Sequence, residues 1–166
     1  MGRQIHKDNT SGQVILLDTK IFWHINDKNI VQIDSDNIAV IGEYTTEEGP
    51  WFDDWFLAFV DKSGIWQSIS MYSDCIDRAT QFLSDKFEMD LTKTHLAAST
   101  VWCSYVTYPL HLTSKAIFKL TEGDNYKAPK NYLNKLQYAL GLGDFDTSRN
   151  IDLTDEIKAY LNSVSL

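Results

Sequence analysis

The residues of this chain that could do chemistry are concentrated between positions 27 and 61. That segment contains nine acidic residues and a single basic residue, Lys28, and its net charge of −8 equals that of the whole chain. Within it, the stretch 43–55 mixes carboxylates with large aromatic side chains. The candidate partner-binding residues of this stretch are Glu43, Glu47, Glu48, Trp51, Phe52, Asp53, Asp54 and Trp55.

Carboxylates placed beside aromatic rings favour the binding of a basic protein. The rings bury apolar area in an interface, and the charges steer the encounter with a partner of opposite sign. This chemistry predicts a non-enzymatic interaction domain that binds and neutralises a basic partner, as an acidic immunity protein or antitoxin would. In the alternative interpretation the rings belong to the core and the acids border turns, because aromatic residues in strands usually serve packing.

The same carboxylates also allow a second functional hypothesis, a small carboxylate- or metal-dependent hydrolase. Asp53 and Asp54 are adjacent, so in a strand they would point to opposite faces, and only a loop or bulge would let both hold one cation. Trp51 could stack on a sugar ring. This hypothesis predicts a concave pocket in which at least two of Glu43, Asp53, Asp54 and a histidine converge. No spacing fixes such a pair, so we assign no catalytic residue, metal ligand or cofactor.

The segment 144–155 partly resembles an EF-hand calcium loop. Oxygen-bearing side chains occupy its relative positions 1, 3, 5, 9 and 12, and Ile151 occupies the central apolar position. However, Arg149 stands where the loop needs a glycine, and Asp155 is shorter than the usual bidentate glutamate. We therefore interpret 144–155 as a polar connection between two helices, in which Asp and Thr residues cap the second helix.

Charge and cysteine usage restrict the partners and the compartment. With 15 basic against 23 acidic residues, the chain repels phosphate backbones, which argues against nucleic acid and anionic membranes as partners. No apolar run reaches the length of a membrane span, and the polar start of the chain does not resemble a secretory signal. Cys75 and Cys103 have no CxxC spacing and are typical of a reducing compartment, so we predict a cytoplasmic protein.

The elements that must position these residues begin with strands. Short runs rich in β-branched and aromatic residues, separated by polar turn residues, predict strands over 14–17, 20–25, 29–34, 38–45, 55–60 and 65–72. Gly64 predicts a tight hairpin at 61–64. The run 55–60 is apolar at every position, which indicates a central strand covered on both faces. Short sequential connections predict an antiparallel meander of about five strands.

Helical spacing of apolar residues takes over after residue 74. It predicts a helix from Asp74, with Asp74 as its cap, a second helix from about Pro129 to Gly141 or Gly143, and a last helix from about Thr154. The intervening stretches 101–108 and 115–120 favour strands. The order of elements predicts one α+β domain over 1–166, strand-rich over 13–72 and helix-rich over 74–166, with helices of the C-terminal half packed on the sheet.

Overall fold

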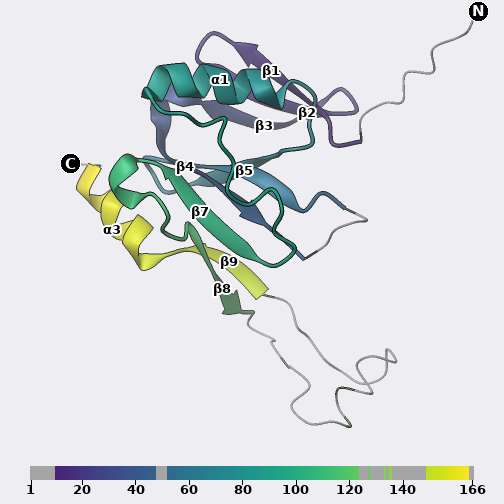
Figure 1. Cartoon of the computed structure of the whole chain (residues 1–166), viewed down its shortest axis with the longest axis vertical. Coiled ribbons are helices and arrows are strands. Elements are labelled where there is room, and N and C mark those ends of the chain that lie inside the picture. Colours follow the sequence, from purple (N-terminus) through teal and green to yellow (C-terminus); the bar gives the residue numbers. More distant parts are fainter. Residues whose placement is uncertain are drawn as a thin grey trace, which may run out of the picture. The chain divides into compact units, whose positions relative to one another are not determined.

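The computed structural model describes residues 10–47, 52–123, 127, 133, 135 and 149–164. Within them the chain is a mixed α+β protein with nine strands, two α-helices and two short 3-10 helices (Figure 1). The strands are β1 (Gln13–Leu17), β2 (Lys20–Ile25), β3 (Lys28–Asp34), β4 (Ile38–Thr45), β5 (Trp55–Asp61), β6 (Trp66–Ser70), β7 (Cys103–Tyr108), β8 (Phe118–Glu122) and β9 (Arg149–Leu153). The helices are α1 (Ile76–Phe87), α3 (Asp155–Val164), η1 (Ser35–Asn37) and η2 (Leu110–Leu112).

The strands form three antiparallel sheets, so the predicted single meander of about five strands is wrong. The sheets have the orders β1-β2-β3, β6-β5-β4-β7 and β8-β9. The first meander ends at β3 because η1, and not a hairpin turn, leads to β4. Asp34 caps η1 by accepting a hydrogen bond from the Asp36 amide, and the Ser35 amide donates to Thr19 O at 2.8 Å. The chain thereby leaves the first sheet and starts a second one.

The second sheet has its most buried strands, β4 and β5, in the middle. Every residue of β4 is buried, and β5 is buried from Leu57 to Val60. The prediction that 55–60 forms a central strand covered on both faces is therefore confirmed. The predicted hairpin is confirmed too. Gly64 adopts a positive φ of 87°, and the Asp61 carboxylate accepts hydrogen bonds from the amides of Ser63 and Ile65.

One hydrophobic core joins the two larger sheets and α1. Apolar side chains of β4, β5 and β6 meet side chains of β1–β3 and the apolar stripe of α1, where Ala79 and Leu83 are fully buried. Burial of a leucine or isoleucine contributes roughly 2 kcal/mol. The predicted Asp74 cap is wrong, because the backbone of Asp74 is used elsewhere. Its amide donates to Gly12 O and its carbonyl accepts from Val14, and Cys75 takes the N-cap position without a side-chain hydrogen bond.

From residue 74 onward, the described residues contain the strands β7, β8 and β9 as well as the helices α1 and α3. Residues 149–153, interpreted as part of a polar helix connection, form β9, which pairs with β8. That interpretation is therefore wrong for residues 149–153, whose backbone pairs with β8 along its whole length, whereas residues 144–148 lie outside the described residues. The predicted helix from Pro129 lies outside the described residues, apart from Leu133 and Lys135. The last helix is confirmed as α3.

The chain divides into two compact units, one of residues 1–117 with 155–166 and one of residues 118–154. The first contains the two larger sheets, α1 and α3, and α3 buries Ile157 and Leu161 within it. The second contains β8 and β9. A single domain over 1–166, with a helix-rich part from 74 onward, stays a prediction. No described helix combines the length and apolarity that crossing a bilayer requires.

Candidate functional site

Glu43 is a buried structural carboxylate. It lies on β4 with 4% of its surface exposed. Trp55 Nε1 donates to its Oε2 at 2.8 Å, the His95 amide donates to Oε1 at 2.5 Å, and the Leu96 amide donates to Oε2 at 3.2 Å. Three N–H groups from β5 and from the segment after α1 thus satisfy the two oxygens. Glu43 is one of the predicted partner-binding residues, and the structure buries it.

Asp53 and Asp54 lie just before β5 and are both half-buried. The Ser11 hydroxyl donates to Asp53 Oδ1 at 2.9 Å, and the Tyr72 hydroxyl donates to Asp54 Oδ1 at 2.7 Å. The Thr46 amide donates to Asp54 O at 2.7 Å, which extends the pairing of β4 with β5 by one step. Among the described residues, no ion pair is formed by either aspartate. Their negative charges are therefore held in place without a neutralising lysine or arginine from that part of the chain.

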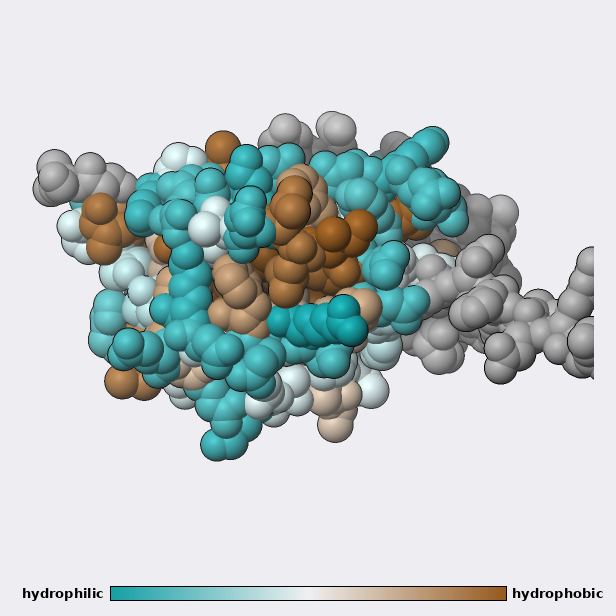
Figure 2. Space-filling view, turned by 90° about the horizontal axis from the view of Figure 1, so that it is seen from above, coloured by the Kyte–Doolittle hydropathy of each residue, from teal (hydrophilic) through white to brown (hydrophobic). Residues whose placement is uncertain are grey.

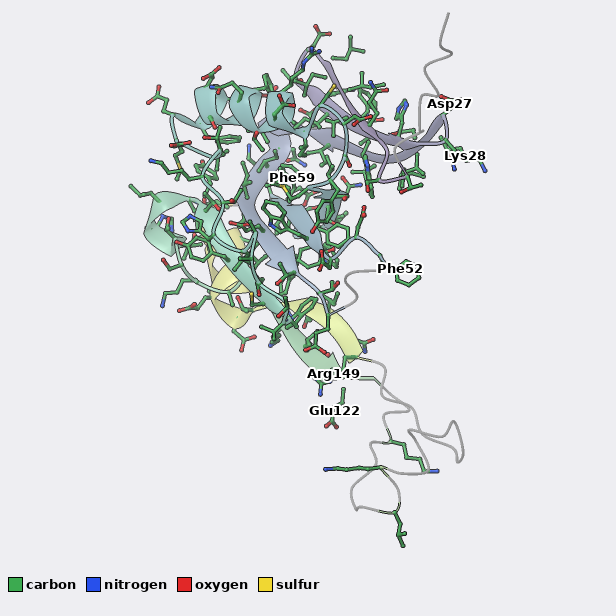
Figure 3. The ribbon with its side chains drawn as sticks, turned by 45° about the vertical axis from the view of Figure 1, so that its right-hand side comes forward. Asp27, Lys28, Phe52, Phe59, Glu122 and Arg149 are labelled. Atoms are coloured by element: carbon green, nitrogen blue, oxygen red, sulfur yellow. The ribbon has the colours of Figure 1, made fainter. Side chains whose placement is uncertain are left out.

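The aromatic residues of the predicted site do not share one environment. Phe52 is 73% exposed and projects away from β5 at the start of the described segment that leads into this strand (Figure 3). Trp55 is half-buried, and its indole N–H points inward and donates to the buried Glu43. Glu47 is exposed beyond the end of β4, and Glu48 and Trp51 lie outside the described residues. The interpretation that these aromatic rings belong to the core therefore fits Trp55 in part and does not fit Phe52.

Tyr72 belongs to this surface, although sequence analysis did not include it. Its side chain is 48% exposed, and its ring meets that of Trp55 edge-on at a centroid distance of 6.2 Å. The hydrogen bond to Asp54, followed by burial and by the negative charges of Asp54 and Asp53, raises the pKa of Tyr72 to about 12. Glu47, Phe52, Asp53, Asp54, Trp55 and Tyr72 are called the acidic–aromatic surface below.

The register of the β5–β6 hairpin explains why Tyr72 lies beside Asp54. Phe56 pairs with Ser70, and the Met71 amide donates to Trp55 O at 3.0 Å. One step further, Asp54 and Tyr72 therefore stand opposite each other. Because the turn at 61–64 fixes this register, counting outward from Ser63 would have found the pair in the sequence.

An open groove adjoins the acidic–aromatic surface at Trp55. It has a volume of about 720 Å³, and its apolar lining comes from Trp55, Met71, Ile76 and Leu91. Polar side chains of α1, including Asp77 and Arg78, line it as well. Its described lining includes no histidine and none of Glu43, Asp53 and Asp54. The groove therefore differs from the pocket that the hydrolase hypothesis predicts.

A second apolar surface lies on the first sheet. Ile15, Leu17 and Ile30 are 40%, 61% and 50% exposed. Figure 2 shows an apolar area ringed by hydrophilic side chains on the side of the molecule that carries α1 and β1. Sequence analysis missed this surface, since β1 is apolar at consecutive positions and its pattern does not reveal which of its two faces meets the core.

No group of three or more histidine, cysteine, aspartate or glutamate side chains within the described ranges is arranged to hold a metal ion. Compared with protein-family models, curated proteins and solved structures, the chain gave no match.

Proposed function

We propose that this chain is a non-enzymatic protein-interaction domain whose acidic–aromatic surface binds a basic protein, in the manner of an immunity protein or antitoxin. The observation that carries the proposal is the pair Asp53 and Asp54. Both carboxylates are fixed by hydroxyl donors, and neither forms an ion pair within the described part of the chain. They stand next to the exposed ring of Phe52 and the partly exposed ring of Tyr72.

The electrostatics at Tyr72 support a cationic partner. The same carboxylates that raise the pKa of Tyr72 disfavour a phenolate, so they favour a positive charge at that place. A lysine or arginine of a partner could pair with them without first breaking an internal ion pair of the described residues. The overall net charge of −8 acts in the same direction by accelerating the encounter with a basic protein and by opposing nucleic acid.

The position of the carboxylates supports binding over hydrolysis. Hydrolysis by two carboxylates requires both to converge on a substrate held in a concave site. Glu43 is already committed to three N–H donors, and Asp53 and Asp54 are outside the lining of the described groove. The free thiols of Cys75 and Cys103 support the further proposal of a cytoplasmic location, where thiols stay reduced.

The test is capture of basic proteins by the immobilised chain. Wild-type protein is exposed to lysate of its source cells at low and at high salt, and bound proteins are identified. We expect capture of a basic protein that weakens steeply with salt, and at least about tenfold weaker capture by the Asp53→Asn/Asp54→Asn variant. Asparagine keeps a hydrogen-bond acceptor for Ser11 and Tyr72 while removing both charges.

The matched control is the Asp18→Asn/Asp27→Asn variant, which has the same change in net charge. Both aspartates are exposed in turns of the first sheet, at positive φ values that asparagine tolerates. We expect this variant to capture the partner as wild type does. Equal capture by all three proteins, or capture that does not respond to salt, would refute the proposal.

A further inference from the structure

We infer that the partner is engaged through a segment that presents an apolar side chain and, close to it in sequence, a lysine or arginine. The apolar side chain enters the groove beside Trp55, and the cation contacts Asp53 and Asp54. This inference rests on the proposed function and specifies which part of a basic protein the surface recognises.

The groove has the volume and the apolar lining of a pocket that can receive an apolar side chain. Its volume of about 720 Å³ lies within the ~300–1,000 Å³ that is usual for pockets that hold ligands. Trp55, Met71, Ile76 and Leu91 supply an apolar lining from β5, from the turn after β6, from α1 and from the segment after α1. A few side chains that fill well-packed pockets commonly contribute most of the binding energy of an interface.

The groove and the carboxylates are continuous through two aromatic rings. Trp55 lines the groove and meets Tyr72 at a centroid distance of 6.2 Å, and the Tyr72 hydroxyl bonds to Asp54 Oδ1 at 2.7 Å. An extended chain advances about 3.3 Å per residue. A partner segment can therefore fill the groove and reach Asp54 with residues that lie only a few positions apart.

Charge complementarity determines which kind of partner segment fits the groove and the carboxylates beside it. The groove itself carries Asp77 and Arg78, whose charges offset each other. The excess charge beside it comes from Asp53 and Asp54, so the residue next to the anchor must be a cation. A second copy of this chain, with its net charge of −8, is a poor occupant on the same ground.

The experiment measures the binding of four labelled peptides of equal length to the full chain by fluorescence anisotropy. The first contains a leucine and two neighbouring lysines in a neutral, polar background. In the second, serine replaces leucine; in the third, glutamine replaces the lysines; and in the fourth, glutamate replaces them. We expect the first peptide to bind at least about tenfold more tightly than the second and the third, and the fourth to bind weakest.

Variants of the chain locate the two contacts. Thr94→Trp enlarges an exposed residue of the groove lining and should weaken the first peptide at least about tenfold while leaving the second unchanged. Thr100→Trp, at an exposed position outside that lining, is its control and should change neither. Asp53→Asn/Asp54→Asn should weaken both lysine-containing peptides.

The outcomes separate this inference from the proposed function. If the first and second peptides bind equally and Thr94→Trp changes nothing, while Asp53→Asn/Asp54→Asn abolishes binding, the inference is wrong and the acidic–aromatic surface still binds bases. If the third peptide binds as well as the first, or if no peptide binds, the inference is also wrong. The capture experiment with the whole partner then decides the proposed function independently.

Discussion

Glu43, Asp53 and Asp54 come from one short acidic stretch, yet their carboxylates differ in burial and in hydrogen-bond donors. Glu43 is buried and receives three N–H donors, whereas Asp53 and Asp54 are half-buried and receive hydroxyl donors at the surface. The difference follows from position. Glu43 lies inside a strand that is buried along its whole length, and the two aspartates precede the next strand. The carboxylate inside the sheet is buried among backbone and indole donors, and the two at its end reach the surface.

The largest expected effect is on stability, from Glu43→Ala. Removal of the carboxylate leaves the indole N–H of Trp55 and the amides of His95 and Leu96 without their acceptor. We expect a loss of about 3 kcal/mol in the free energy of unfolding, measured by urea denaturation. Glu47→Ala, at an exposed position, is the control and should change it by less than about 0.5 kcal/mol. Similar losses for both variants would remove the distinction between a structural and a surface carboxylate.

A smaller loss of stability is expected from Trp55→Phe. Trp55 contacts both the buried Glu43 and Tyr72 of the acidic–aromatic surface. The phenyl ring keeps much of the apolar contact but cannot donate to Glu43 Oε2. We expect a loss of roughly 1–2 kcal/mol in the free energy of unfolding, again from urea denaturation. If Glu43→Ala is introduced first, the added cost of Trp55→Phe should fall, since the acceptor is already gone. Fully additive losses would contradict the described hydrogen bond.

The titration of the Tyr72 hydroxyl tests its contact with Asp54 in the acidic–aromatic surface. Its pKa is raised from the ordinary value of 10.0 to about 12, so folding favours the protonated phenol. The stabilisation is fully present below about pH 10 and is lost as the pH rises from 10 to 12. The titration of Tyr72 can be followed by phenolate absorbance as a function of pH, taken as the difference between the wild type and the Tyr72→Phe variant. Asp54→Asn should move it back toward pH 10, and an unchanged titration would contradict the contact.

The smallest effect is expected from Asp53→Asn. The amide oxygen can still accept the hydrogen bond from Ser11, and no ion pair within the described residues is lost. We expect the free energy of unfolding to change by less than about 0.5 kcal/mol in urea denaturation. A loss comparable to that of Glu43→Ala would assign Asp53 to the fold and not to the surface.

Much of the first half of the fold could be predicted from the sequence, because local signals determine it. Strand ranges followed from runs of β-branched and aromatic residues, and Gly64 marked the hairpin correctly. The sheet order could not be predicted in the same way. It depends on η1 and on the pairing of β7 with β4, and that pairing joins residues about sixty positions apart.

The candidate site was predicted in part, for a related reason. Composition located the acidic stretch, but charge alone does not tell a buried carboxylate from an exposed one. The burial of Glu43 depends on backbone amides of His95 and Leu96, which no pattern around Glu43 indicates. Tyr72 could have been found from the hairpin register, and the groove could not, since α1 and the segment after it complete its lining.

The most direct measurement of the central claim is a hydrogen–deuterium exchange footprint of the wild-type chain with its captured partner. Binding at the acidic–aromatic surface predicts slower amide exchange in the segments that contain Phe52 to Trp55 and Met71 to Tyr72. It predicts unchanged exchange at the turns that carry Asp18 and Asp27. Protection confined to those turns or to β1–β3, with none at 52–55, would contradict the account.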